Sequence, residues 1–234
     1  MVPEPHDSAA SAWTLVVPVR HGEEGKTRLR VPDGVTRSDL ARAMATDAIA
    51  AVRGCEQVAR VVLVTPDPVL RQLVGGADDV ELLDDPGGGL AAAVTSGVER
   101  ALHTTGRTGS GAAGSSVAVL LADLPCLQPA DLDAALHAAA AFASAVVPDA
   151  EGTGSVLLTG RPGTALRPAF GAGSAVRHEA LGAHRLALDL PRLRRDVDTT
   201  EALDEAVRLG VGPRTRAVLD AATRSPAAQR SQLA

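Results

Sequence analysis

The 234-residue sequence predicts an α/β fold in which helices form layers on both faces of a mostly parallel central sheet. Runs of β-branched and other apolar residues, about four to eight residues long, are typical of buried strands. Along this chain they alternate with longer segments in which apolar residues recur at helical spacing. Such alternation is typical of three-layer α/β domains. The length is within the range of one domain.

The apolar runs predict the strands. The first of them, Trp13-Thr-Leu-Val-Val-Pro-Val19, is too short for a helix and rich in β-branched side chains. A buried strand accommodates such a run because both of its faces are covered. The predicted strands cover residues 13–19, 58–65, 80–83, 117–122, 144–147, 155–159 and 185–188.

Helical spacing and capping residues predict the helices between these strands. We expect Ser38 to cap the N-terminus of the first helix and Gly54 to end it. Pro129 is expected at the first position of a later helix, where its missing N–H is tolerated. The predicted helices cover residues 38–53, a short stretch within 67–74, 90 to about 102, 129 to about 143, 175–181 and 199–209.

One domain is expected over residues 13–223. Residues 1–12 and 224–234 are predicted to be disordered tails, because neither carries the apolar periodicity of the rest. Residues 104–116 are rich in Gly, Ser and Thr, which predicts a flexible surface loop.

Composition limits the function classes. The net charge is −5, without the basic stripe of a nucleic-acid-binding protein. The longest weakly polar stretch, residues 134–147, is too short to span a bilayer, and the polar start of the chain does not resemble a signal peptide. Cys55 and Cys126 are isolated, which indicates neither a zinc site nor a disulfide framework. We therefore expect a soluble cytoplasmic protein.

A phosphate-binding loop is expected after the first strand. Residues 20–27, Arg20-His-Gly-Glu-Glu-Gly-Lys-Thr27, nearly match the P-loop pattern, but Arg stands where its first Gly is needed. Pro32 and Gly34 then occupy the region where a P-loop requires a helix, so a P-loop ATPase or GTPase is rejected. Lys26 is the only lysine, and with Arg28 it is expected to reach a phosphate. The alternative is that Lys26 is a chance survivor in an arginine-rich composition.

A glycine run, Asp85-Pro-Gly-Gly-Gly89, lies between a predicted strand and a predicted helix. Without side chains, the backbone of Gly87, Gly88 and Gly89 can approach a ligand closely. An ordinary loop between strand and helix is the alternative. The run is expected at the carboxyl ends of the strands, where ligands bind in open α/β sheets.

Three aspartates are candidate metal ligands. Asp123 follows a predicted strand, a common place for a carboxylate that holds Mg²⁺ for substrate phosphates. Asp196 and Asp198 alternate in an extended segment, so both carboxylates can face one ion. A helix cap is the alternative for Asp123. For the other two the alternative is surface ion pairs with the neighbouring arginines, Arg192, Arg194 and Arg195.

Two glycine loops could bind a small anion. Glu151-Gly-Thr-Gly154 and Phe170-Gly-Ala-Gly-Ser174 each lie between apolar segments and offer backbone amides and small hydroxyls. Ordinary turns are the alternative interpretation. The six histidines form no cluster in the sequence, and no nucleophile elbow is present, so hydrolase chemistry is set aside.

Taken together, six motifs resemble those of one known family, and they occur in its order from about residue 13 to residue 212. The family is the phosphoenolpyruvate or 2-phospho-L-lactate guanylyltransferases of deazaflavin coenzyme F-420 biosynthesis. The motifs are Val16-Val-Pro-Val19 with Gly25-Lys-Thr-Arg-Leu29, Asp85-Pro-Gly-Gly-Gly-Leu90, Asp123-Leu-Pro125, Glu151-Gly-Thr-Gly154, Phe170-Gly-x-x-Ser174 and Asp196-Val-Asp-Thr199.

The resemblance implies a single-domain, Rossmann-like nucleotidyltransferase fold, similar to that of the molybdenum-cofactor nucleotidyltransferases. It implies that Asp123, Asp196 and Asp198 hold Mg²⁺. Three further residues are implied to bind the carboxylate end of phosphoenolpyruvate: Thr153, Gly171 and Ser174.

The implied reaction is transfer of GMP from GTP to the phosphate of phosphoenolpyruvate. Lys26 and Arg28 would hold the GTP phosphates, and the loop at Gly87–Gly89 would approach the nucleotide. The product would be labile, which favours a transient contact with the next enzyme, a deazaflavin-dependent phosphotransferase. Two alternatives stay open: another acceptor, such as 2-phospho-L-lactate or a pterin nucleotide, and a non-catalytic nucleotide-binding module.

Overall fold

The computed structural model describes residues 12–19, 29–32, 34–105 and 116–223. The predicted tails and the predicted loop at 104–116 therefore lie almost entirely outside the described residues. The strands that it describes form one sheet in the order β3-β2-β1-β4-β6-β5-β7. Their bounds are β1 (Trp13–Pro18), β2 (Val58–Val64), β3 (Val80–Leu83), β4 (Ser116–Leu120), β5 (Ser144–Pro148), β6 (Ser155–Gly160) and β7 (His184–Arg185).

The sheet is mostly parallel. β1 pairs in parallel with β2 and β4, β2 with β3, and β5 with β7. β6 alone runs antiparallel to its neighbours β4 and β5. The reason is the short connection from β5 to β6, since a parallel crossover needs about a dozen residues or more. The expected mostly parallel α/β fold is thus confirmed, with one antiparallel strand that the sequence did not predict.

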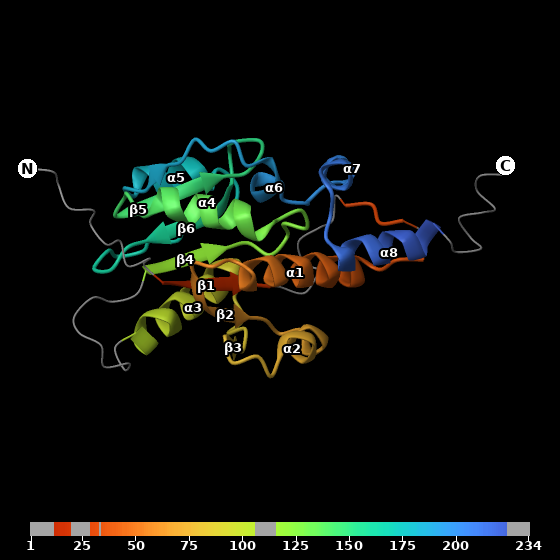
Figure 1. The fold of residues 1–234 in the computed structure, drawn as a ribbon, viewed down its shortest axis with the longest axis horizontal. Helices are drawn as coiled ribbons and strands as arrows, with labels where there is room; N and C mark the ends of the chain where they lie inside the picture. Colours follow the sequence, from red (N-terminus) through yellow and green to blue (C-terminus); the bar gives the residue numbers. More distant parts are fainter. Residues whose placement is uncertain (1–11, 20–28, 33, 106–115, 224–234) are drawn as a thin grey trace, which may run out of the picture.

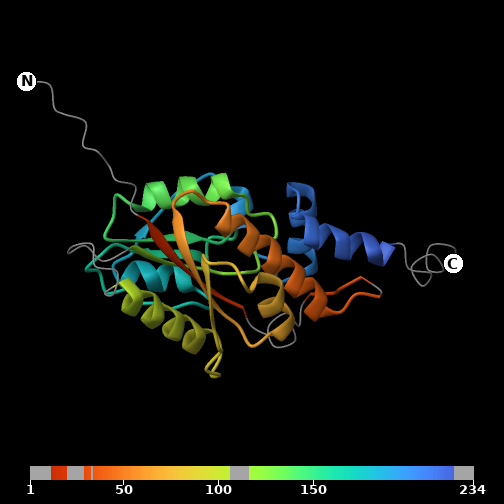
Figure 2. The same cartoon turned by 60° about the horizontal axis from the view of Figure 1, so that its bottom comes forward.

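Helices cover both faces of the sheet, which gives three layers (Figures 1 and 2). Neighbouring side chains on a strand point to opposite faces. Val17 of β1 therefore belongs to the core beneath α1 and α4, and Val16 to the core beneath α3. The helices are α1 (Arg37–Arg53), α2 (Pro68–Val74), α3 (Leu90–Thr105), α4 (Pro129–Ala139), α5 (Ser174–Ala180), α6 (Pro191–Arg194), α7 (Thr200–Leu209) and α8 (Pro213–Thr223).

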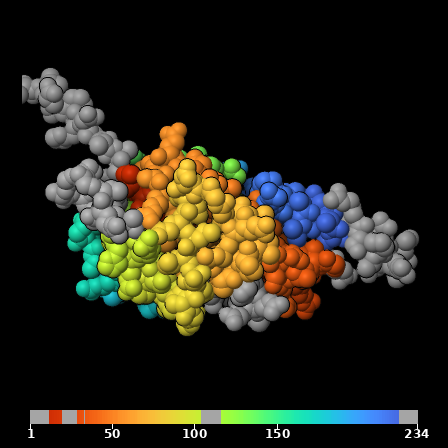
Figure 3. Space-filling model, turned by 90° about the horizontal axis from the view of Figure 1, so that it is seen from below, coloured from red at the N-terminus to blue at the C-terminus, as the bar shows by residue number. Residues whose placement is uncertain are grey.

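The C-terminal helices pack against α1. Leu203 and Ala206 of α7 share a small core with Leu40 and Met44 of α1. The buried carboxylate of Asp47, also in α1, accepts the first backbone N–H groups of α8. Figure 3 shows the face formed by the segment from β2 to α3, with α8 at one end. The sequence predicted α7 but neither α6 nor α8.

Two predicted helix ends are wrong. The first helix is capped by Thr36 rather than Ser38, because the Thr36 hydroxyl accepts the backbone N–H of Asp39 at 3.0 Å. The helix that begins at Pro129 ends at Ala139 rather than near residue 143. Arg161 accounts for this early end, since its guanidinium and its backbone N–H bind carbonyls of the turn that follows.

Among the described residues, each helix is too short or too polar to cross a lipid bilayer.

Close contact between α3 and the sheet gives a stability prediction. A methyl group at Gly97 would lie 2.9 Å from Val64 and closer still to Val16, so there is no room for it. Overpacking of this kind costs about 1–3 kcal/mol, which exceeds the roughly 1 kcal/mol that alanine gains over glycine in a helix. We expect Gly97→Ala to lower the free energy of unfolding in a denaturant titration.

The control is Thr95→Ala on the exposed side of the same helix, which should unfold at or above the wild-type midpoint. A Gly97→Ala variant as stable as wild type would show that α3 can move away from the sheet without loss.

Candidate active site

The candidate residues lie at the edge of the sheet where the parallel strands end, among them β1, β4 and β5. β4 is parallel to β1, and β5 has the same direction as β4, because both are antiparallel to β6. Their carboxyl ends therefore meet at one edge, where ligands bind in open α/β sheets. Asp123 follows β4, and Asp149 follows β5 directly.

Five carboxylates gather at this edge. Oxygens of Asp149, Glu151 and Asp196 lie within 4.8 Å of one another. Asp123 and Asp198 are close enough for their charges to act on Asp196. A backbone hydrogen bond of 3.0 Å from the N–H of Val197 to the carbonyl of Asp123 joins the two segments. We call these five residues the acidic cluster.

Burial and the neighbouring carboxylates raise the pKa of the Asp196 carboxyl from its ordinary value of 3.8 to about 7. Burial is the largest cause, because it disfavours the charged form, and the negative charges of the other four carboxylates add to it. A divalent cation would remove this cost, since carboxylate oxygens are the ligands that such ions take. The acidic cluster therefore fits a divalent metal.

The predicted metal ligands Asp123, Asp196 and Asp198 all belong to the acidic cluster, and their assignment as ligands stays a prediction. Asp149 and Glu151 were not among the predicted metal ligands, although Glu151 begins one of the two predicted anion-binding loops. A signal for Asp149 was present, because it follows a predicted strand just as Asp123 does.

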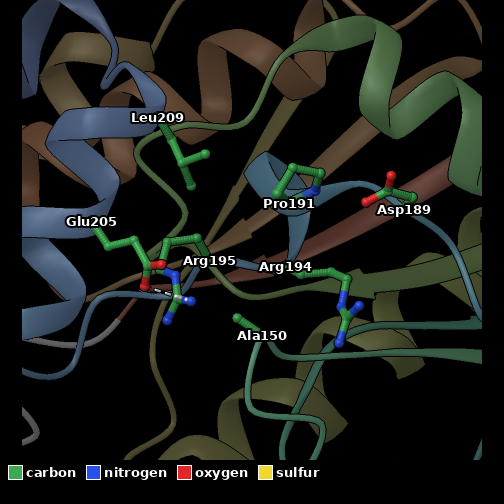
Figure 4. Close-up of a pocket in the computed structure, with 7 residues that line it drawn as sticks. All are labelled: Ala150, Asp189, Pro191, Arg194, Arg195, Glu205 and Leu209. Atoms are coloured by element: carbon green, nitrogen blue, oxygen red, sulfur yellow. Dashed lines mark ion pairs between the residues drawn. The ribbon is translucent and has the colours of Figure 1, made fainter.

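Within the described residues, Arg194 and Arg195 bind groups of the loop after β5, and Arg195 also binds Glu205. Arg194 donates to the carbonyls of Pro148 and Asp149, at 3.2 Å from Nε and, for Asp149, at 2.8 Å from Nη2. Arg195 pairs with Glu151 at 2.6 Å and with Glu205 at 2.7 Å. Figure 4 shows both arginines beside a pocket of about 230 Å³ next to the acidic cluster. The arginines hold the loop after β5.

The structure brings together the three residues implied to bind the acceptor carboxylate. The carbonyl of Thr153 accepts the N–H of Ala175 at 3.1 Å, and that of Gly171 accepts the N–H of Ser174 at 3.0 Å. Thr153 is exposed and Ser174 is buried at the start of α5. Gly171 has a φ of 114°, which L side chains rarely adopt. Their role as binding residues stays a prediction.

A buried histidine that the sequence analysis did not single out supports this loop. The backbone N–H of Ala169 donates a hydrogen bond to His178 Nε2, with 2.8 Å between the two nitrogens. Nδ1 therefore carries the hydrogen and donates to Ser155 Oγ at 3.0 Å. Burial is the main reason that the pKa of His178 falls to about 4, with the Arg177 charge adding to it. The ring is neutral near pH 7 and fixes the start of the loop.

The glycine run lies at the same edge of the sheet, but farther along it. Gly87, Gly88 and Gly89 have φ angles of 76°, 85° and 84°, so all three positions favour glycine. They follow β3, which the sheet order separates from β4 by β2 and β1. Lys26 and Arg28 lie outside the described residues.

The sequence of this chain is similar to those of known nucleotidyltransferases. The family model of the MobA-like NTP transferase domain matches residues 27–205. A phosphoenolpyruvate guanylyltransferase of Thermomonospora curvata is 42% identical over 97% of this chain and 96% of its own. One of Streptomyces coelicolor is 46% identical over 88% of this chain and 95% of its own.

This chain belongs to the phosphoenolpyruvate guanylyltransferase family. Its domain is that of a nucleotidyltransferase, an enzyme that binds a nucleotide and a phosphate substrate.

Solved structures share the fold at low sequence identity. A candidate nucleotide-diphospho-sugar transferase of Desulfovibrio desulfuricans has a TM-score of 0.62 and 17% identity, and covers 91% of this chain and 96% of its own. Rv0371c of Mycobacterium tuberculosis, solved in complex with manganese, has a TM-score of 0.52 and 19% identity, with 85% and 98% coverage.

The raised pKa of Asp196 makes stability depend on pH and on metal. Between pH values near 4 and 7, the folded protein keeps a proton that the unfolded chain has lost, so stability falls as pH rises. A bound cation offsets this loss most at high pH, where the carboxylate is charged. We expect Mg²⁺ or Mn²⁺ to raise the melting temperature more at pH 8 than at pH 5.5.

The test is thermal unfolding of wild type and Asp196→Asn with and without the cation. Without metal at pH 8, Asp196→Asn should melt at a higher temperature than wild type. Addition of the cation should raise its melting temperature by less than that of wild type. The exposed Asp78→Asn is the matched surface control. A metal response that is the same in Asp196→Asn and wild type contradicts the assignment.

Proposed function

We propose that this protein transfers GMP from GTP to the phosphate of phosphoenolpyruvate, and that it releases pyrophosphate. The observation that supports this most directly is the loop from Asp149 to Gly154. Its first residues belong to the acidic cluster, and Thr153 lies beside Gly171 and Ser174. A small molecule with a phosphate at one end and a carboxylate at the other would reach both.

In the proposed reaction, an oxygen of the acceptor phosphate forms a bond to the α-phosphorus of GTP. The bond from that phosphorus to the bridging oxygen of the β-phosphate breaks, and pyrophosphate leaves with the electron pair. The product is enolpyruvyl-diphospho-guanosine. The protein contributes mainly position and charge stabilisation, as in other phosphoryl and nucleotidyl transfers.

The acidic cluster would hold Mg²⁺, with Asp123, Asp196 and Asp198 as the proposed ligands. The ion supplies charge neutralisation for the two anionic phosphates that must meet. Asp196 fits this role because its own charge is disfavoured by burial and by its neighbours.

The two substrates are assigned to separate groups of residues. Lys26 and Arg28 are proposed to hold the GTP phosphates, and the backbone at Gly87–Gly89 to approach the nucleotide. The acceptor carboxylate would be bound by the exposed Thr153 hydroxyl, by Ser174 and by backbone amides near Gly171. Because the loops are fixed by hydrogen bonds within the protein, they would be ordered before the acceptor binds.

We also propose a role in coenzyme F-420 biosynthesis, which the motif resemblance to the guanylyltransferases of that pathway supports. The enolpyruvyl diphosphate product would be labile in water. A transient contact with the downstream phosphotransferase would shorten its time in solution, and we propose that enzyme as a partner.

Pyrophosphate release tests the proposed function. We expect release from GTP that depends on phosphoenolpyruvate and on Mg²⁺, and that is slower with 2-phospho-L-lactate or 3-phosphoglycerate as acceptor. CTP and ATP serve as nucleotide controls. Equal rates with 2-phospho-L-lactate would support the alternative acceptor. Absence of turnover with every acceptor, from protein that still binds GTP, would favour a non-catalytic nucleotide-binding module.

A further inference from the structure

The Asp149 carboxylate binds backbone N–H groups of the loop that follows β5. Oδ1 accepts the backbone N–H of Thr153 at 2.9 Å, and Oδ2 accepts that of Gly154 at 2.6 Å. The side chain is buried, with 8% of its residue surface exposed. Hydrogen bonds to an ionised acceptor are among the stronger ones in proteins, so the contact fixes the loop firmly.

Gly154 is matched to this carboxylate. A Cβ atom there would collide with Asp149 Oδ2, although the backbone of Gly154 is not in the left-handed region. Glycine is therefore needed for room next to Asp149 and not for its conformational freedom.

Other contacts fix the remaining backbone of the loop. Arg185 donates to the carbonyl of Gly152 at 2.8 Å, and Arg194 to that of Asp149. The Thr153 carbonyl accepts the N–H of Ala175 in α5. The side chain of Asp149 joins the acidic cluster directly to the backbone of Thr153.

We propose that Asp149 is a positioning residue for acceptor recognition. Its carboxylate sets the distance between the acidic cluster, where the phosphate is bound, and Thr153, where the carboxylate is bound. The proposal rests on the proposed function, and it separates Asp149 from the metal ligands even though its oxygens lie near Asp196.

The chain contains a matched control for this arrangement. Asp47 is buried to the same degree, at 7% exposure, and accepts the backbone N–H groups of Arg214 and Thr215 at 3.0 and 2.8 Å. A Cβ atom at Gly212 would collide with Asp47 as one at Gly154 would with Asp149. Asp47 and Gly212 thus form a second carboxylate–glycine pair, which lies where α1 meets the start of α8.

Steady-state kinetics on Asp149→Asn and Asp47→Asn separate positioning from stability. Both variants should melt at lower temperature, because each loses a hydrogen bond to a charged acceptor. In Asp149→Asn alone, the KM for phosphoenolpyruvate should rise roughly tenfold, the effect of one such bond. Its kcat should fall less, its KM for GTP should stay at the wild-type value, and its half-saturating Mg²⁺ should change by less than the KM for phosphoenolpyruvate.

Gly154→Ala tests the same contact without removal of the carboxylate. It should raise the KM for phosphoenolpyruvate, whereas Gly212→Ala should only lower the melting temperature. In an Asp149→Ala background the added methyl has no carboxylate to meet, so Gly154→Ala should have little further effect. Such non-additivity is the signature of two residues in direct contact.

Amide hydrogen exchange of the loop tests the contact without turnover. The amides of Thr153 and Gly154 should exchange faster in Asp149→Asn and at the wild-type rate in Asp47→Asn. Unchanged exchange or an unchanged KM for the acceptor overturns the proposal, and a rise in half-saturating Mg²⁺ as large as that in KM makes Asp149 a metal ligand instead. If the wild type turns over no acceptor, the proposed function fails, while faster exchange still supports the contact.

Discussion

Repulsion among five carboxylates at one edge of the sheet is the constraint on which the rest of the site depends. Like charges at such short range are tolerated when the carboxylates share a proton or a cation. The raised pKa of Asp196 means that this carboxyl keeps its proton to a higher pH than an ordinary aspartate does. The adjacent arginines do not neutralise this residue, because they bind Glu151, Glu205 and backbone carbonyls. A divalent cation bound at the acidic cluster would offset this repulsion.

The fold explains how these residues come together. Parallel strands place their carboxyl ends at one edge, and the antiparallel β6 lets the chain turn back directly after β5. The loop formed there is short, so one end carries two carboxylates of the acidic cluster while the other carries Thr153. α5 then begins beside Thr153 and brings Gly171 and Ser174 with it. One short loop thus carries two carboxylates of the acidic cluster together with Thr153, which is proposed to bind the acceptor.

Local pattern was enough to predict the layers of the fold, since the buried parts of the central strands are apolar runs such as Val61–Val64. The helix α8 was not predictable in this way. Its first N–H groups are bound by Asp47, which is 167 residues earlier than Arg214 in the chain. The antiparallel direction of β6 also depends on pairing rather than composition. At the site, the position of Asp123 after a strand and the alternation of Asp196 and Asp198 predicted three members of the acidic cluster. The proposed role of Asp149 depends on its contacts within the folded loop.

Direct binding of Mn²⁺, a paramagnetic substitute for Mg²⁺, tests most directly whether the acidic cluster is a cation site. Electron paramagnetic resonance of free Mn²⁺ during titration gives the affinity and number of ions for wild type and for Asp196→Asn, with and without phosphoenolpyruvate. The account predicts binding to wild type that is tightened by phosphoenolpyruvate and largely lost in Asp196→Asn. Equal binding by the two proteins, unaffected by phosphoenolpyruvate, would contradict it.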